Sequence, residues 1–353
     1  MNLANAARRP LEFYRSLPKV ELHRHLEGSL RFETVRDVAR SHGLDMPATS
    51  KLRSMIQIQE NEPLTIENFL SKFATLRTFY RSPEIIMRVT REAIADAAAD
   101  NVRYLELRFT PVALSKSQGF PLSQVMDWVI EGSQQGERES GVVTRLIASV
   151  NRHEGVALAA QVSYLAIERK DKGIVGLDLA GSEPGFPAEP FASIFCTAKE
   201  AGLHLTIHAG EWDHGENVAH AIEDVGASRI GHGIRVVESP TALELARQSQ
   251  IPFEVCITSN YQSGAVANLE SHPLAQMLAQ GLYVTINTDD PSISQITLGD
   301  EYRLFCETLG FPIEILRERV LAAARASFLP EADREKLVKA LDSEFHSLLN
   351  LSP

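Results

Sequence analysis

Residues 20–26 read V-E-L-H-R-H-L, a largely apolar run that carries His23 and His25. Side chains alternate faces along an extended strand, so these two imidazoles point the same way. Two imidazoles on one face of a buried strand are costly to leave unpaired, and a divalent metal satisfies both. The alternative is a pair of histidines satisfied within the core, and this stretch alone does not separate the two readings.

Seven further apolar, β-branched runs follow and alternate with helical patterns such as Pro83–Asp100 and Leu122–Ser140. The eight expected strands are Val20–His23, Val102–Phe109, Thr144–Val150, Ile174–Leu179, His204–His208, Arg229–Gly231, Pro252–Cys256 and Tyr283–Asn287. Strands that alternate with helices lie parallel, and eight repeats predict an α/β fold, the closed (β/α)8 TIM barrel. The competing open, doubly wound sheet is disfavoured because no G-x-G-x-x-G follows an early strand.

The whole chain, 1–353, is expected to form one barrel domain, because such barrels run from 200 to over 400 residues. About 75 residues separate the first two strands, which is far longer than an ordinary connection. We expect a helical insertion at about 30–100, with an apolar stripe at helical spacing formed by Ile66, Phe69, Leu70 and Phe73. Spacing alone favours core packing for this stripe over a lid above the barrel mouth.

The bulk composition excludes several classes of function. The net charge of -11 and the absence of a long basic run argue against nucleic-acid binding. No stretch of about 18 apolar residues predicts a membrane span. Three widely spaced cysteines without a C-x-x-C suit a reducing compartment, and the N-terminal segment lacks the apolar core of a signal peptide, so we expect a cytoplasmic protein. Oligomeric state stays open.

Polar side chains gather where the expected strands end, which in this fold is the catalytic face. They are His23, His25, Glu27, Asp178, His208, Glu211, His232, Asp289 and Asp290. The set indicates one zinc ion (Zn2+) per chain, with His23, His25, His208 and Asp289 as ligands. Glu211 and His232 remain beside it without a ligand role, and such groups move protons in hydrolytic zinc centres.

With these residues in hand, the chain resembles the adenosine deaminase family of the amidohydrolase superfamily. The resemblance extends over nearly the whole chain, through the segments 20–28, 105–111, 178–183, 208–211, 229–233, 253–256, 287–291 and 327–330.

The resemblance implies hydrolytic deamination of a 6-aminopurine nucleoside at C6. Its pattern makes Glu211 the acid that protonates N1 and His232 the group that orients and deprotonates the attacking water. Asp289 would be both ligand and catalytic residue. Substrate would contact His25, Glu27, Asp290 as acceptor facing N7, and Gly181 through its backbone facing N3. The stripe Ile66, Phe69, Leu70 and Phe73 resembles the family's apolar substrate cover, which favours the lid.

Two positions depart from the family pattern. Glu27 stands where many adenosine-specific members have an Asp that contacts the ribose 5′-hydroxyl, and relatives that use adenine also have Glu there. Ile257 stands where Pro usually follows Cys256. The run of residues 107–111 and the apolar stripe nevertheless resemble the nucleoside enzymes, so the expected reaction converts adenosine or 2′-deoxyadenosine to inosine or 2′-deoxyinosine and ammonia. The alternative substrates are adenine, an N6-substituted adenine and 6-aminodeoxyfutalosine.

The sequence disfavours two other classes of function. Binuclear amide or phosphoester hydrolases of the superfamily typically use a carboxylated lysine at the end of strand four, where this chain has Asp178 and no Lys. A barrel that binds a nucleoside without turning it over is disfavoured because the predicted ligands and the acid are all present.

Overall fold

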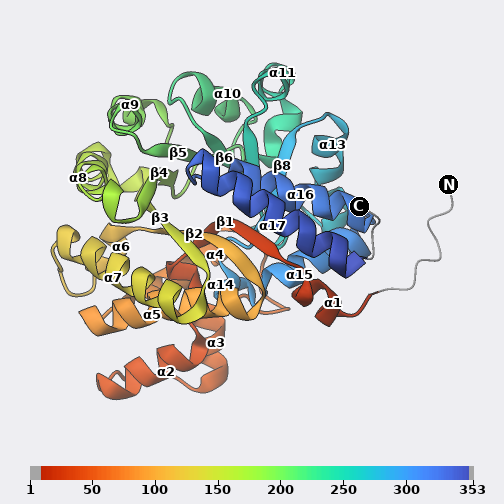
Figure 1. Ribbon diagram of the computed structural model, residues 1–353. Helices are drawn as coiled ribbons and strands as arrows, with labels where there is room; N and C mark the ends of the chain where they lie inside the picture. Colours follow the sequence, from red (N-terminus) through yellow and green to blue (C-terminus); the bar gives the residue numbers. More distant parts are fainter. Residues whose placement is uncertain (1–8, 350–353) are drawn as a thin grey trace.

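The computed structural model describes residues 9–349, in which eight parallel strands form one barrel inside a ring of helices (Figure 1). The strands are β1 (Lys19–His25), β2 (Val102–Phe109), β3 (Val143–Asn151), β4 (Ile174–Ala180), β5 (His204–Ala209), β6 (Arg229–His232), β7 (Pro252–Val255) and β8 (Tyr283–Ile286). Neighbours in sequence pair with one another. Beyond β8, Asp289 N–H donates to His23 O at 2.9 Å and Asp289 O accepts from His25 N–H at 2.8 Å, which brings the segment after β8 onto β1. The predicted TIM barrel is thus confirmed, whereas the predicted domain ends, residues 1 and 353, lie outside the described part.

Helices follow or precede each strand. They are α1 (Leu11–Ser16), α2 (Phe32–Ser41), α3 (Thr49–Ile56), α4 (Ile66–Leu76), α5 (Pro83–Ala99), α6 (Pro111–Ser115), α7 (Leu122–Ser140), α8 (Val156–Ile167), α9 (Ala192–Glu200), α10 (Glu216–Glu223), α11 (Pro240–Ser249), α12 (Ile257–Gln262), α13 (Leu274–Ala279), α14 (Pro291–Ser294), α15 (Leu298–Arg303), α16 (Ile313–Ala326) and α17 (Glu331–Leu349). Short turns are η1 (Glu27–Ser29), η2 (Arg77–Phe79), η3 (Arg152–Glu154), η4 (Lys170–Lys172), η5 (Glu189–Phe191), η6 (Ile234–Glu238), η7 (Leu269–Ser271) and η8 (Leu304–Thr308). Over residues 9–349 no helix is long and apolar enough to cross a membrane.

Local sequence explains where the ring helices begin and end. Ser82 caps α5, where its side chain accepts from the N–H of Ile85, and Pro83 fills the first turn. Helix α7 ends at Gly141, whose φ of 75° is a left-handed conformation that glycine adopts without strain. These signals are readable in the sequence, so the predicted bounds of both helices agree with the structure to within one residue.

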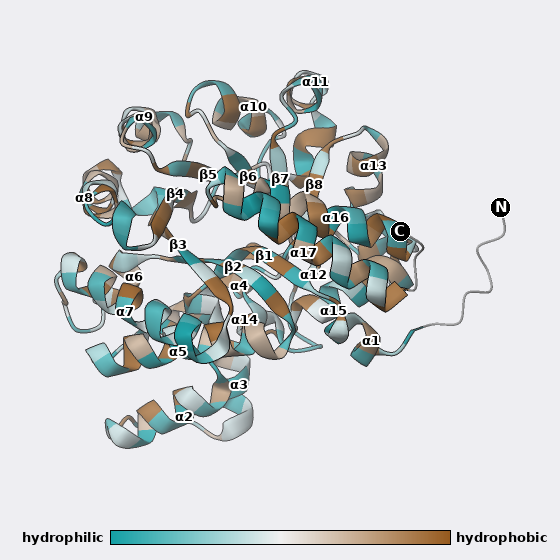
Figure 2. Cartoon of the chain, viewed as in Figure 1, coloured by the Kyte–Doolittle hydropathy of each residue, from teal (hydrophilic) through white to brown (hydrophobic). Residues whose placement is uncertain are grey.

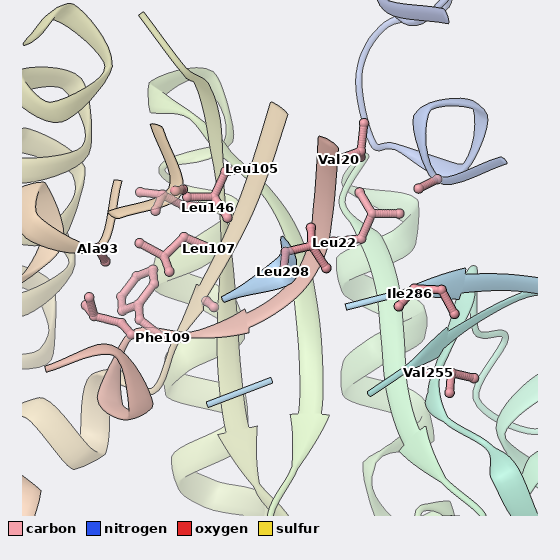
Figure 3. Close-up of a cluster of buried hydrophobic side chains, with 14 of the residues drawn as sticks. Val20, Leu22, Ala93, Leu105, Leu107, Phe109, Leu146, Val255, Ile286 and Leu298 are labelled. Atoms are coloured by element: carbon pink, nitrogen blue, oxygen red, sulfur yellow. The ribbon is translucent and has the colours of Figure 1, made fainter. Parts of the chain in front are cut away.

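The core lies inside the barrel and between the barrel and its helices. Figure 3 shows Leu105, Leu107 and Phe109 of β2 directed toward the segment that carries Ala93 of α5. All four side chains are fully buried. The helices combine hydrophobic and hydrophilic segments (Figure 2), as expected for elements with one face on a barrel and one in solvent.

The segment between β1 and β2 contains the predicted insertion. Helices α2, α3 and α4 come before α5, and α5 itself packs on α7 and β2 as a member of the ring. Of the expected insertion at about 30–100, the last part therefore belongs to the barrel. Helices α3 and α4 pack against each other, and α4 contacts the η1 turn that follows β1. This placement brings α4 to the end of the barrel where β1 ends.

Candidate active site

Four of the predicted side chains converge at the carboxyl ends of the strands. His23 and His25 come from β1, His208 from β5, and Asp289 from the segment after β8. One ligand atom of each lies within 4.8 Å of one ligand atom of every other, and all four residues are buried or nearly so. The H-x-H pair of residues 20–26 therefore does share one face.

The donor set fits a single divalent metal. Oδ1 of Asp289 lies 3.3 Å from Nε2 of His23 and 3.3 Å from Nε2 of His25. Ligands placed tetrahedrally at about 2.0–2.1 Å from zinc stand about 3.3–3.4 Å apart. Nε2 of His23 is buried and has no hydrogen-bond partner within residues 9–349. Burial lowers the pKa of His25 well below its usual value, so the ring is neutral, the form that binds a metal.

Two carboxylates fix the orientation of the ligand imidazoles. Nδ1 of His23 lies 2.8 Å from Oε2 of Glu254, and Nδ1 of His208 lies 3.0 Å from Oδ1 of Asp178. Because a carboxylate accepts, each Nδ1 carries the proton and each Nε2 keeps its lone pair for the site. Asp289 is held in the same way, since its Oδ2 accepts from the hydroxyl of Ser259 at 2.6 Å.

Buried arginines hold these carboxylates ionised. Arg108 lies 2.7 Å from Glu254 and 3.5 Å from Asp178, and Arg229 donates from Nε to Glu254 at 2.5 Å. Burial opposes ionisation, but the charges of Arg108 and Arg229 hold the pKa of Glu254 well below its usual value. No role for these two arginines was predicted from the sequence. The sequence feature that could have revealed them is a charged residue within an apolar strand. Such a residue needs an oppositely charged partner, which another strand must supply.

This network predicts that Glu254→Ala lowers the free energy of unfolding by about 3–5 kcal/mol, because it removes the buried carboxylate that two guanidinium groups share and leaves Arg108 with Asp178 and Arg229 with Glu106. Urea titration in the presence of a chelator measures the change apart from any bound metal. Glu244→Ala is the matched control, since Glu244 pairs with Arg247 on the surface and should change stability by less than about 1 kcal/mol. Equal effects of the two substitutions would contradict this account.

Glu211 and His232 lie beside the metal-ligand cluster. Nε2 of His232 is 3.6 Å from Oε2 of Glu211 and 3.9 Å from Oδ2 of Asp289. Burial, together with the charge of Asp289, raises the pKa of Glu211 well above its usual value. Burial also lowers the pKa of His232 well below its usual value. At neutral pH the site thus pairs a protonated carboxyl with an unprotonated imidazole, the states needed for an acid and a base.

Asp290 is another buried carboxyl of the site, and its pKa is shifted in the opposite direction from that of Asp289. Burial and the charge of Asp289 raise the pKa of Asp290 well above its usual value, which favours the protonated form of this carboxyl. The family resemblance implied that Asp290 is an acceptor facing N7. Purine N7 carries a lone pair and needs a donor, and a protonated Asp290 supplies one. A Cβ on Gly28 would stand 1.8 Å from Oδ1 of Asp290, so glycine makes room for it.

The backbone of two site residues is strained. Asp289 has φ of 68° and His232 has φ of 57°, conformations that are uncommon outside glycine. Such conformations persist where the surrounding structure enforces them, and they gather at functional sites. His232 is the last residue of β6 and Asp289 lies three residues after the end of β8, so both strained positions are at the carboxyl ends of barrel strands.

A cavity above this cluster contains most of the predicted substrate residues. It is lined by His25, Glu27, Phe69, Phe73, Arg77, Thr110, Asn151, His153, Ala180, Gly181, His208, Glu211, Trp212, His232, Asp289 and Asp290. Of the apolar stripe on α4, Phe69 and Phe73 line it, while Ile66 and Leu70 are not among its lining residues. Gly181 has φ of 87°, and a Cβ there would stand 2.9 Å from Nδ1 of His153, so its backbone borders the cavity closely.

A larger hollow of about 760 Å³ lies at the opposite end of the barrel. It is bordered by Arg145 and Ile174 near the starts of β3 and β4, and by His204 at the start of β5. The chemical groups described above are absent from its lining, so size alone does not identify the active site of this fold.

A barrel with a histidine and aspartate cluster at the carboxyl ends of its strands, next to a buried acid, defines a hydrolase of the amidohydrolase type. The family model described as adenosine deaminase matches residues 18–344. The chain belongs to the adenosine deaminase family.

Individual relatives agree on the family and differ in their substrates. The adenosine deaminase of Klebsiella pneumoniae is 36% identical over 326 residues, which cover 92% of this chain and 97% of that protein. The adenine deaminase of Arthrobacter aurescens superimposes with a TM-score of 0.86 at 28% identity, covering 93% of this chain and 99% of the other. An amidohydrolase from Burkholderia ambifaria, solved with bound zinc, superimposes with a TM-score of 0.87 at 25% identity. The match covers 98% of this chain and 95% of that one.

Proposed function

We propose that this protein hydrolyses adenosine and 2′-deoxyadenosine to inosine and 2′-deoxyinosine, with release of ammonia. The observation that carries the proposal is the four-ligand cluster with Glu211 and His232 beside it, at the floor of one cavity. The Klebsiella relative, named an adenosine deaminase and matched over almost its full length, supports the same reaction.

The chemistry divides among the residues as follows. His23, His25, His208 and Asp289 would hold zinc, and the bound metal would supply the lowered water pKa that attack on C6 at neutral pH requires. Protonated Glu211 donates to N1, which makes C6 electrophilic. Neutral His232 orients the water and accepts its proton. Asp290 donates to N7, and the backbone N–H of Gly181 faces N3.

The sugar end of the cavity favours a nucleoside over a free base. Oε1 of Glu27 accepts from the N–H of Thr110 at 2.6 Å, whereas its Oε2 is buried without a partner in the described part of the chain. Arg77, on the turn after α4, likewise has a buried Nε without a partner there. A hydroxyl group can donate to one and accept from the other. Adenine has no such group, and each unpaired buried atom costs about 1–3 kcal/mol.

Free adenine is the second candidate, supported by the resemblance to the Arthrobacter adenine deaminase. A panel of adenosine, 2′-deoxyadenosine, 5′-deoxyadenosine, N6-methyladenosine and adenine, followed by ultraviolet absorbance and ammonia release, separates the two. We expect kcat/KM for adenosine to exceed that for adenine and for 5′-deoxyadenosine by about 100-fold or more, because a site built to bond a hydroxyl rejects analogues without it. A preference for adenine would overturn the proposal.

The variant Arg77→Met tests the same end of the cavity. It keeps much of the side-chain volume and removes the donor, so kcat/KM for adenosine should fall by about 10- to 100-fold. Activity on 5′-deoxyadenosine should stay within about threefold of the wild type. An equal loss on both substrates would mean that Arg77 supports the lid and does not contact the sugar.

A further inference from the structure

Glu183, in the loop after β4, binds the loop after β5 through one carboxylate. Its oxygens accept from four consecutive backbone N–H groups and one side chain. The donors are Gly210 N at 2.6 Å, Glu211 N at 3.0 Å, Trp212 N at 3.1 Å, Asp213 N at 3.3 Å and Asn217 Nδ2 at 2.8 Å. Glu183 is 2% exposed, so these bonds form away from bulk water.

Consecutive N–H groups that turn toward one point form a concave anion site. Gly210, with φ of 66°, lets the chain turn at the start of this loop, and a carboxylate of the protein itself fills the site. Bonds to a buried charged acceptor are stronger than those between neutral groups, so the path of residues 210–213 is fixed.

The side chain of Glu211 has little else to hold it. Its Oε1 is buried without a hydrogen-bond partner in residues 9–349, and its Oε2 lies 3.6 Å from His232, beyond hydrogen-bond distance. The direction of this carboxyl therefore depends on its own backbone, which Glu183 anchors through the N–H of Glu211 itself.

A second tether, made by other groups, joins the loop after β4 to the end of β5 itself. Arg152, on η3, donates to the carbonyl of His208 and, at 3.1 Å, to that of Phe186. The N–H of Phe186 donates in turn to the carbonyl of Glu183 at 3.0 Å. Because this tether also supports the loop, loss of the Glu183 carboxylate should leave the fold in place and loosen residues 210–213.

We propose that Glu183 is the positioning residue for Glu211, holding the loop after β5 so that the Glu211 carboxyl faces the reacting ring. The catalytic part of this role, the placement of the Glu211 carboxyl against a substrate ring, rests on the proposed function. Within residues 9–349 the Glu183 carboxylate accepts from residues 210–213 and from Asn217, and from none of the side chains His23, His25, His208 and Asp289, so it acts through the backbone of Glu211.

A double-mutant cycle distinguishes positioning from general support of the fold. Glu183→Gln should lower kcat for adenosine by about 100-fold, with KM within about threefold, because a displacement near 1 Å has that effect on a catalytic group. Zinc content should not change. In a Glu211→Gln background the same substitution should lower kcat by less than about threefold. Additive losses in the double variant would overturn the proposal.

Amide hydrogen exchange tests the anchor without any substrate. In Glu183→Gln, the amides of residues 210–213 should exchange at least about tenfold faster, while those of β6 stay unchanged. Unchanged exchange at 210–213 would overturn the proposal. If the wild type deaminates no aminopurine, the proposed function is wrong. The amide exchange rates of residues 210–213 then still show whether Glu183 anchors this loop.

Two further variants complete the test. Glu189→Gln, an exposed carboxylate further along the same loop, should leave both exchange and kcat unchanged. Glu183→Asp keeps the charge and shortens its reach, so it serves if the Gln variant fails to fold. It should give a smaller loss of kcat that again disappears in the Glu211→Gln background, and persistence of that loss would count against the proposal.

Discussion

Glu211→Gln is expected to lower kcat for adenosine by about 1000-fold or more while the protein keeps one zinc per chain. A glutamine side chain fills the same space and has no proton of suitable acidity for N1, and general acid catalysis contributes about 100- to 10,000-fold. Zinc is measured by atomic absorption and kcat by the fall in absorbance of adenosine. Full activity of this variant would remove Glu211 from the mechanism.

The pH profile supplies a second measure of the same group. Burial and the charge of Asp289 raise the pKa of Glu211, and only its protonated form donates. Raising the pH through that pKa removes the donor, so kcat/KM should fall on the alkaline side in the wild type. The fall should disappear in Glu211→Gln and remain in Glu216→Gln, an exposed carboxylate at the start of α10.

The barrel and the convergence of the four side chains could be predicted from sequence because their signals are local. Each strand is a short apolar run, and each ligand follows such a run, so the fold rule for parallel strands brings distant residues such as His23 and Asp289 together. The H-x-H pair required only the two-residue repeat of a strand. The structure bears out the convergence of these side chains.

The supporting residues could not be predicted in the same way because their partners are far apart in the chain. Glu254 supports His23 across 231 positions, and Glu183 reaches a loop that begins 27 residues later. No spacing rule connects such pairs. Arg77 is similar, since its place in the lining of the cavity depends on where the turn after α4 lies relative to the barrel. Tertiary packing determines these contacts. Neither the secondary-structure propensities of the residues nor the hydrophobic periodicity of the sequence predicts that packing.

His25→Ala is expected to weaken zinc binding by roughly 100- to 1000-fold. Structural zinc sites with four ligands contribute about 10–16 kcal/mol, or about 2.5–4 kcal/mol per ligand, which corresponds to that factor. His25 is the variant of choice because its side chain is 12% exposed, whereas His23 is fully buried, so its loss disturbs the core least. Competition with a chromophoric chelator measures the affinity, and kcat should fall in parallel at limiting zinc.

The matched control for this variant is His42→Ala at the exposed end of α2, which should bind zinc as the wild type does. The wild type stripped by a chelator should lose activity and regain it on addition of one equivalent of zinc, because the remaining donors are already oriented by Glu254 and Asp178. If His25→Ala retained one zinc per chain at wild-type affinity, the ion would lie elsewhere. The shared face of residues 20–26 would then have a purely structural role, with its two imidazoles satisfied by protein groups.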